Sequence, residues 1–328
     1  MKLQDLIKYR NHLEDIIDGD KNIEEQIFAH LNKFNKTVNF SNFDTNNVKQ
    51  DMFKNQDQIL KSLKGLYNNL NTIKNSLQSQ ITELEQKYMV KSEEIYNDNL
   101  KKPYQIKQNE YENFSLLGNP GYEENAGHDS NKEFVGTLLK YVDFKWPGLE
   151  IGPAKGDLTA KLVALDPLYI ADMHSNNFKN VQKLWNDVYQ KRLRYYVLDD
   201  TIKDPMHQLP KEQFGFIVAC DWFNFKTQDV IECYLQSAFG LLRPGGAILF
   251  TYNNCCYPKA VDKVDKMYYT YVNGNTLKKY CESVGFKIIS EYNGEKEADW
   301  CASWLELQKP GELTSLRGGQ NLGAINQL

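Results

Sequence analysis

The spacing of apolar residues divides the chain into a helical first part and a later part in which strands and helices alternate. Over residues 1–35, apolar positions recur at helical intervals with a break near Asp18-Gly19-Asp20. This pattern predicts a helical hairpin or a kinked helix. An Asn-rich passage over residues 35–47 predicts a loop.

The passage from Met52 to Leu84 carries an apolar seam that repeats about every 3.5 residues, as in a coiled coil. Gln80 stands where one further apolar residue belongs, and a long helix of this polarity is marginal in water without a partner. We therefore expect a coiled coil that mediates self-association, with an intramolecular helical hairpin as the alternative. The seam consists of Ile59, Leu63, Leu66, Leu70, Ile73, Leu77 and Leu84.

Proline and glycine positions suggest where the parts of the chain meet. Residues 101–130 contain Pro103 and the run Gly118-Asn119-Pro120-Gly121, which predicts a linker. We expect residues 1–100 to be a helical, coiled-coil oligomerisation region and residues 131–308 to form a globular domain. Residues 309–328 follow as a C-terminal strap or tail, whose recurring aliphatic residues predict that it is ordered.

From residue 131 onward, short apolar runs alternate with segments that favour helices. This alternation predicts an α/β domain with a mostly parallel sheet and helices on both faces. In such sheets ligands bind beyond the carboxyl ends of the strands. The strands are predicted near residues 149–151, 167–171, 194–198, 214–219, 247–251, 286–291 and 301–307, and the helices over residues 131–143, 157–163, 177–192, 227–242 and 275–284.

The stretch Leu149–Thr159 contains the end of the first of these strands, a glycine-bearing turn and the start of a helical run. Gly152 and Gly156 stand four residues apart, and glycine lets a backbone approach a ligand that a Cβ would block. No Gly-Lys-Ser/Thr closes a P-loop, and Ala154 and Asp157 occupy positions where a Gly-x-Gly-x-x-Gly pattern has glycine. The alternative is an ordinary strand-to-helix turn.

Acidic residues close the next three predicted strands. Asp172 lies twenty residues beyond Gly152, where a carboxylate can accept hydrogen bonds from both ribose hydroxyls. Asp199 and Asp200 close the third strand, a position suited to an adenine amino group. Asp221 closes the fourth and is followed by Trp222, which can cover the adenine or wall a substrate pocket. Helix capping explains a single Asp of this kind, but three in succession favour a ligand site.

Residues 131–308 resemble a class I S-adenosylmethionine-dependent methyltransferase. The resemblance implies a Rossmann-like seven-stranded sheet with helices on both faces and the last strand antiparallel, here preceded by the all-α helical arm. It is carried by Asp172 and Asp200 and by three runs: Glu150-Ile-Gly-Pro-Ala-Lys-Gly-Asp-Leu-Thr159, Leu241-Leu-Arg-Pro-Gly-Gly-Ala-Ile-Leu-Phe250 and Thr276-Leu-Lys-Lys-Tyr-Cys-Glu-Ser-Val-Gly-Phe286.

The resemblance also implies roles in binding S-adenosyl-L-methionine. The turn residues Gly152, Ala154 and Gly156 would approach the methionine moiety and the ribose, and Glu150 would orient the loop or the amino end of the cofactor. Ala154 departs from the glycine that the family often has there. Asp172 would hold the ribose and Asp200, or else Asp199, the adenine.

The acceptor side of the site is less defined. The sequence Ala219-Cys-Asp-Trp-Phe-Asn224 differs from the Asn/Asp-Pro-Pro-Tyr/Phe motif of similar enzymes that methylate amide or adenine nitrogens. Asp221 is the candidate base, and Tyr252 and Asn253 are candidates for orienting a polar acceptor, or else polar residues that cap the sheet. The insert over residues 257–271 is expected to form part of the acceptor pocket or its lid.

Composition narrows the possible functions. Lys and Arg number 39 and Asp and Glu 43, so the chain lacks the basic footprint of a DNA-binding protein. The cysteines have neither metal-site nor disulfide spacing. No apolar run approaches the length of a membrane span, and we expect a cytoplasmic protein. We expect methyl transfer to an unidentified hydroxyl, amine or carboxylate. The alternative is a structural or assembly protein, such as a phage virion component, with a weakly active or inactive domain.

Overall fold

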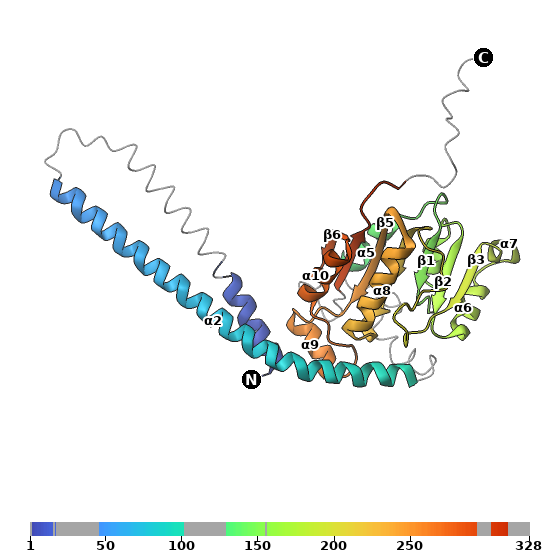
Figure 1. The fold of residues 1–328 in the computed structure, drawn as a ribbon, viewed down its shortest axis with the longest axis horizontal. Coiled ribbons are helices and arrows are strands. Elements are labelled where there is room, and N and C mark those ends of the chain that lie inside the picture. The colour runs from blue at the N-terminus through green and yellow to red at the C-terminus, as the bar shows by residue number, and fades with distance from the viewer. Residues whose placement is uncertain are drawn as a thin grey trace, which may run out of the picture. The chain divides into compact units, whose positions relative to one another are not determined.

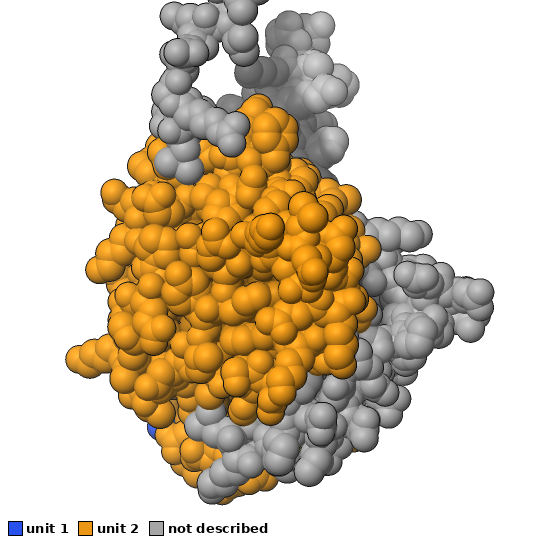
Figure 2. All heavy atoms as spheres, turned by 90° about the vertical axis from the view of Figure 1, so that its right-hand side faces the viewer, with its two compact units in different colours: residues 1–87 blue, residues 88–328 orange. Residues whose placement is uncertain are grey.

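The computed structural model describes residues 2–15, 17, 46–101, 129–154, 156–293 and 303–313. The chain divides into two compact units, residues 1–87 and residues 88–328, of which the second is orange in Figure 2. The division falls inside helix α2 (Asn46–Lys101). The last turns of the predicted coiled-coil region therefore belong to the second unit.

The first unit is a helical hairpin. A helix over residues 3–15 packs against α2, where Arg10 donates a hydrogen bond to Gln78 (3.3 Å) and Lys74 pairs with Glu14 (3.1 Å). The order of these contacts shows that the two helices run antiparallel. The sequence left this hairpin open as the alternative to a coiled coil, and self-association stays a prediction.

The second unit is built on a seven-stranded sheet with the order β3-β2-β1-β4-β5-β7-β6 (Figure 1). Neighbouring strands among the first five are parallel, and β7 runs antiparallel to both β5 and β6. The predicted α/β class and the antiparallel last strand are confirmed. The strands are β1 (Gly148–Ile151), β2 (Leu168–Asp172), β3 (Leu193–Val197), β4 (Phe214–Ala219), β5 (Leu242–Tyr252), β6 (Lys287–Tyr292) and β7 (Ser303–Gln308).

Helices cover both faces of this sheet because its central strands are apolar on both sides. Every residue of β4 is buried, and from Phe216 to Ala219 successive residues alternate between two separate cores. One core takes Ile217 together with residues of α8 (Gln228–Leu241) and α10 (Gly274–Val284). The other takes Phe216 and Val218 together with residues of α5 (Asp129–Leu139), the 3-10 turn η1 (Thr159–Leu162) and α6 (Phe178–Lys183).

The helix predicted over residues 131–143 already ends at Leu139, and two other predicted helices form only in part. The segment over residues 177–192 breaks into the 3-10 turn η2 (Ser175–Asn177), α6 and α7 (Asp187–Gln190). Asn186 causes the break, because its backbone is extended and its side chain caps α7 by accepting a hydrogen bond from the Tyr189 N–H. The segment over residues 157–163 forms only η1.

The edges of the sheet also differ from the prediction. Strand β5 begins at Leu242, five residues before the predicted start at residue 247, and residues 243–246 are a bulged part of the strand, with Gly245 at φ +80°. Lys309 exchanges two backbone hydrogen bonds of 2.9 Å with Gly245 and Gly246, which fixes the start of the C-terminal strap. The rest of the strap, residues 314–328, and residues 102–128 of the linker lie outside the described residues. Among the helices that the structure describes, none has the length and apolar character to cross a membrane.

Candidate ligand-binding site

The turn after β1 has the backbone geometry of a close-approach loop. Gly152, Ala154 and Gly156 all have positive φ values, +75°, +48° and +92°, and two of these three positions are glycine, as the left-handed region favours. The indole of Trp222 lies directly against this turn, since a Cβ on Gly152 would stand 2.4 Å from a ring carbon. The absent side chain of Gly152 therefore lets β1 and the segment after β4 meet.

Asp172 lies at the end of β2 and is 1% exposed. Its carboxylate accepts hydrogen bonds from the His174 N–H (2.7 Å) and from the Asn177 amide (2.8 Å). Burial raises the pKa of this carboxyl group, and the two hydrogen bonds oppose that rise. Since an ionised carboxylate offers about four acceptor positions, two remain for a ligand.

Glu150 lies in β1 and is equally buried. One carboxylate oxygen accepts a hydrogen bond from the Thr159 hydroxyl (2.6 Å), and burial raises the pKa of Glu150 to about 8. At neutral pH the site therefore holds a carboxyl group that is mostly protonated. A positively charged ligand beside it would shift this equilibrium toward the carboxylate.

Three buried acceptor oxygens lie in β1 or in the segments that follow β2 and β4. Within the described residues, Glu150 Oε1, Asn177 Oδ1 and Asn224 Oδ1 have no hydrogen-bond partner, although each side chain is 1% exposed. Leaving such a group unpaired costs about 1–3 kcal/mol. The two amide oxygens can only accept hydrogen bonds, and Glu150 Oε1 accepts once its carboxyl group is ionised, so this edge of the sheet is suited to a ligand that brings hydrogen-bond donors and a positive charge.

Asp200 is the centre of a buried polar group that we call the Asp200 cluster, comprising Asp200, Lys226, Tyr234 and Tyr96. The carboxylate accepts hydrogen bonds from the Tyr234 hydroxyl, the Lys226 ammonium and the Tyr96 hydroxyl, the last at 3.2 Å. Burial lowers the pKa of Lys226, and the adjacent Asp200 opposes that shift. Three donors leave this carboxylate about one free acceptor position.

Sequence reasoning missed three of these four residues. Lys226 stands just before α8, Tyr234 lies within α8, and Tyr96 lies in α2, so no motif or common spacing joins them. Asp199, the other predicted adenine contact, is exposed and accepts hydrogen bonds from the Thr201 N–H (2.9 Å) and hydroxyl (2.6 Å). These local bonds lower its pKa.

The predicted acceptor-side residues have different surroundings. Asp221 has a positive φ of +52°, its N–H donates to the Thr251 hydroxyl (2.7 Å), and its carboxylate accepts from the Asn224 amide (3.1 Å). Tyr252 is buried, which raises its pKa well above the usual value and keeps it neutral. The Asn253 amide donates to two carbonyl oxygens of the insert over residues 257–271, both at 3.0 Å. Asn253 therefore holds that insert.

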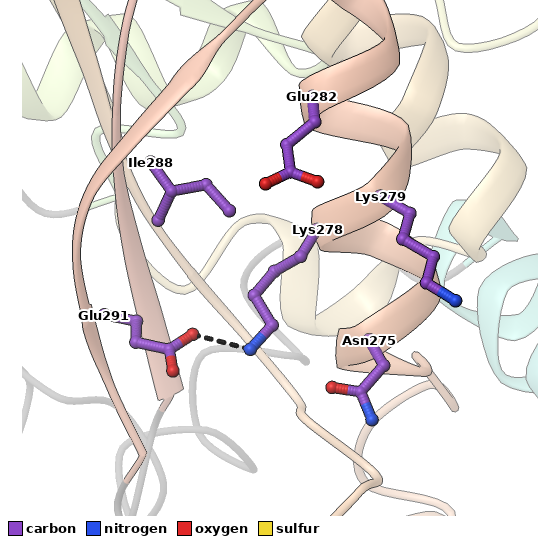
Figure 3. A pocket seen from close by; sticks show the side chains of 6 residues that line it. All are labelled: Asn275, Lys278, Lys279, Glu282, Ile288 and Glu291. Carbon is purple, nitrogen blue, oxygen red and sulfur yellow. Dashed lines mark hydrogen bonds and ion pairs between the residues drawn. The ribbon is translucent and has the colours of Figure 1, made fainter.

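Other parts of the described structure give weaker indications of a metal or ligand site. No three His, Cys, Asp or Glu side chains among the described residues gather to hold a metal ion. A surface hollow of about 500 Å³ lies between α10 and β6, where Lys278 and Glu291 pair across it at 2.8 Å (Figure 3). Its charges compensate one another, and none of the strand-end residues described above lines it. The lining residues are Asn275, Lys278, Lys279, Glu282, Ile288 and Glu291.

A scan against protein-family models and a search of curated proteins find no match to this chain. Similar solved structures include an S-adenosylmethionine-dependent methyltransferase from Mesorhizobium loti, with 12% identity, a TM-score of 0.44, and coverage of 55% of this chain and 98% of that one. The N-methyltransferase NodS from Bradyrhizobium japonicum, in complex with S-adenosyl-L-homocysteine, has 16% identity and a TM-score of 0.42. The match covers 60% of this chain and 95% of NodS.

The CurJ carbon methyltransferase has 20% identity and a TM-score of 0.38 over 51% of this chain, and the chain spans about half (49%) of its length. Likeness at this level does not transfer an activity to the chain.

Proposed function

We propose that the chain binds S-adenosyl-L-methionine at the carboxyl edge of its sheet and transfers a methyl group to an unidentified hydroxyl, amine or carboxylate. The observation that carries this proposal is the buried Asp172, with acceptor positions to spare, beside the glycine turn of β1. When bound, the cofactor supplies a methyl group activated on a sulfonium sulfur. The cofactor also carries hydrogen-bond donors, namely two ribose hydroxyls and an ammonium group. The unpaired acceptor oxygens at the carboxyl edge of the sheet lack such donors.

The residues at the carboxyl edge of the sheet provide suitable partners for the ribose, the methionine part and the adenine of this ligand. Asp172 would accept from the ribose hydroxyls, and Glu150 and the backbone of Gly152 would face the methionine end. Trp222, which packs on Gly152, would line the space between the ribose and the methionine end of the ligand. Asp200 keeps about one acceptor position, which suffices for one N–H of an adenine amino group.

Asp221 is the residue that we propose as general base. Methyl transfer is a displacement that depends on alignment and on exclusion of water, and it needs a base only where the acceptor must lose a proton. Asn224 orients the Asp221 carboxylate through its amide hydrogen bond. The unpaired Asn224 oxygen is then free to accept a hydrogen bond from the acceptor molecule.

The test is calorimetric binding of S-adenosyl-L-homocysteine and S-adenosyl-L-methionine to wild type and to Asp172→Asn. Losing hydrogen bonds to a charged acceptor, at about 1.5–3 kcal/mol each and not additive, should weaken binding at least about tenfold. Asp166→Asn is the matched control, because Asp166 lies near the opposite end of β2 and pairs with Arg192 (3.2 Å). Absence of binding to wild type at millimolar ligand would refute the proposal.

We also propose self-association through Met52–Leu84. Leu66 and Ile73 of the predicted seam are 51% and 49% exposed, so the hairpin leaves part of this apolar surface uncovered. The same segment of a second copy of the chain could bury these exposed apolar side chains in a coiled coil. This association and methyl transfer are compatible, since the proposed ligand site lies in the other unit.

A further inference from the structure

The last turns of α2, which belong to the second unit, contact the α/β part of that unit at several points. The Tyr88 hydroxyl donates to Asp265 (3.0 Å), at the end of α9 (Pro258–Asp265), and the Lys91 ammonium pairs with the same carboxylate (3.3 Å). The Ser92 hydroxyl oxygen accepts a hydrogen bond from the Tyr271 N–H (2.6 Å). These contacts make the end of α2 a built-in part of the α/β domain.

One turn further on, α2 reaches the Asp200 cluster. The Tyr96 hydroxyl donates to Asp200 (3.2 Å), and the Lys226 ammonium lies 5.6 Å from the centroid of the Tyr96 ring. The ammonium is held on its other sides by Asp200 and by the Trp222 ring, whose centroid is 4.3 Å away. Tyr96 therefore helps to enclose a buried cation together with residues that follow β3 and β4.

The Asp200 cluster is continuous with the proposed ligand site. The Lys226 ammonium lies 3.0 Å from the sulfur of Met173, the residue next to Asp172. Trp222, which contacts the same ammonium, packs on Gly152. A ligand that rests on Gly152 and bonds to Asp172 must therefore fit against Trp222 and Lys226.

We propose that Tyr96 is a positioning residue of the ligand site, which holds Lys226 and Trp222 in the places that shape the space beside Gly152 and Asp172. This inference rests on the proposed function, since the ligand is S-adenosyl-L-methionine. The hydroxyl of Tyr96 acts through Asp200, and its ring acts on the ammonium directly. The end of α2 thus helps to shape a site that the sequence assigns to residues 131–308 alone.

The test compares Tyr96→Phe with Tyr88→Phe. Both changes delete one hydroxyl donor to an aspartate from the same helix, but only Tyr96 touches the Asp200 cluster. We expect Tyr96→Phe to weaken binding of S-adenosyl-L-homocysteine about three- to tenfold, while Tyr88→Phe stays within about twofold of wild type. Circular dichroism should show both variants folded.

Equal affinities of the two variants, with wild type binding normally, would overturn the role of Tyr96 and leave the proposed function intact. No binding to wild type would overturn both. A second measurement needs no substitution: in wild type, S-adenosyl-L-homocysteine should slow amide exchange in residues 92–98 and not in residues 66–73. Unchanged exchange in residues 92–98 under saturating ligand would also overturn the inference.

Discussion

Replacing Lys226 with Met tests how the second unit tolerates a buried charge. The substitution keeps an unbranched apolar stem and removes the ammonium. Both partners of the ion pair are buried, with side-chain exposures of 7% for Lys226 and 0% for Asp200, so Asp200 would lose its counter-ion where water cannot replace it.

The expected loss follows from what remains around Asp200. Breaking a buried ion pair from one side costs about 3–5 kcal/mol. The hydroxyls of Tyr234 and Tyr96 still donate to the carboxylate, which places the cost near the lower end, at about 3 kcal/mol. Lys226→Met combined with Asp200→Asn removes both charges and should lie within about 1 kcal/mol of wild type.

Urea unfolding followed by tryptophan fluorescence measures this loss of stability in the second unit. All five tryptophans, at positions 146, 185, 222, 300 and 304, belong to residues 88–328. With a slope of about 3 kcal/mol per molar urea, the midpoint of the single variant should fall by about 1 M. A loss below about 1 kcal/mol, or a double variant as unstable as the single one, would refute the reasoning.

Three further predictions concern the turn, the buried acid and the seam. The pKa of Glu150 near 8 lies above its unfolded value of 4.5, so its stability penalty grows between those pH values. The free energy of unfolding, measured by urea titrations from pH 5 to 9, should therefore fall more steeply for wild type than for Glu150→Gln, by at most about 1.4 kcal/mol per pH unit. Gly152→Ala should destabilise the second unit, because its Cβ would stand 2.4 Å from an indole carbon. Gly136→Ala in α5 meets no atom within 4 Å and should stabilise by about 0.5–1 kcal/mol in the same urea assay. Leu70→Glu combined with Leu77→Glu should convert an oligomer to monomers in light scattering without changing the tryptophan signal, whereas a monomeric wild type would contradict self-association.

The sheet was predictable because each strand carries a local signal. The run over Phe214–Ala219 is apolar throughout, as a strand covered on both faces must be, and it forms β4 with those bounds. Asp172 could be placed at a strand end for the same reason, since an acidic residue terminates the apolar run before it. Alternation of such runs with helical segments then determined the α/β class.

The surroundings of those residues were not predictable. The contact between Tyr96 and Asp200 joins positions 104 residues apart, and no periodic pattern links a tyrosine on a long polar helix to a strand end. Asn186 was missed for a different reason: its capping hydrogen bond overrides a helical pattern that continues through it. Local patterns specify elements, while buried polar partners depend on how those elements pack.

The attachment of α2 also has a consequence for the order of folding. Its partners Asp200, Asp265 and Tyr271 lie 104, 177 and 179 residues beyond the positions that contact them. Closing loops of that size costs chain entropy that must be met before the contacts form. The end of α2 leaves the ribosome before these partners do, and we expect it to dock late, with Ile95, 2% exposed in the folded protein, open to solvent and to other chains until then.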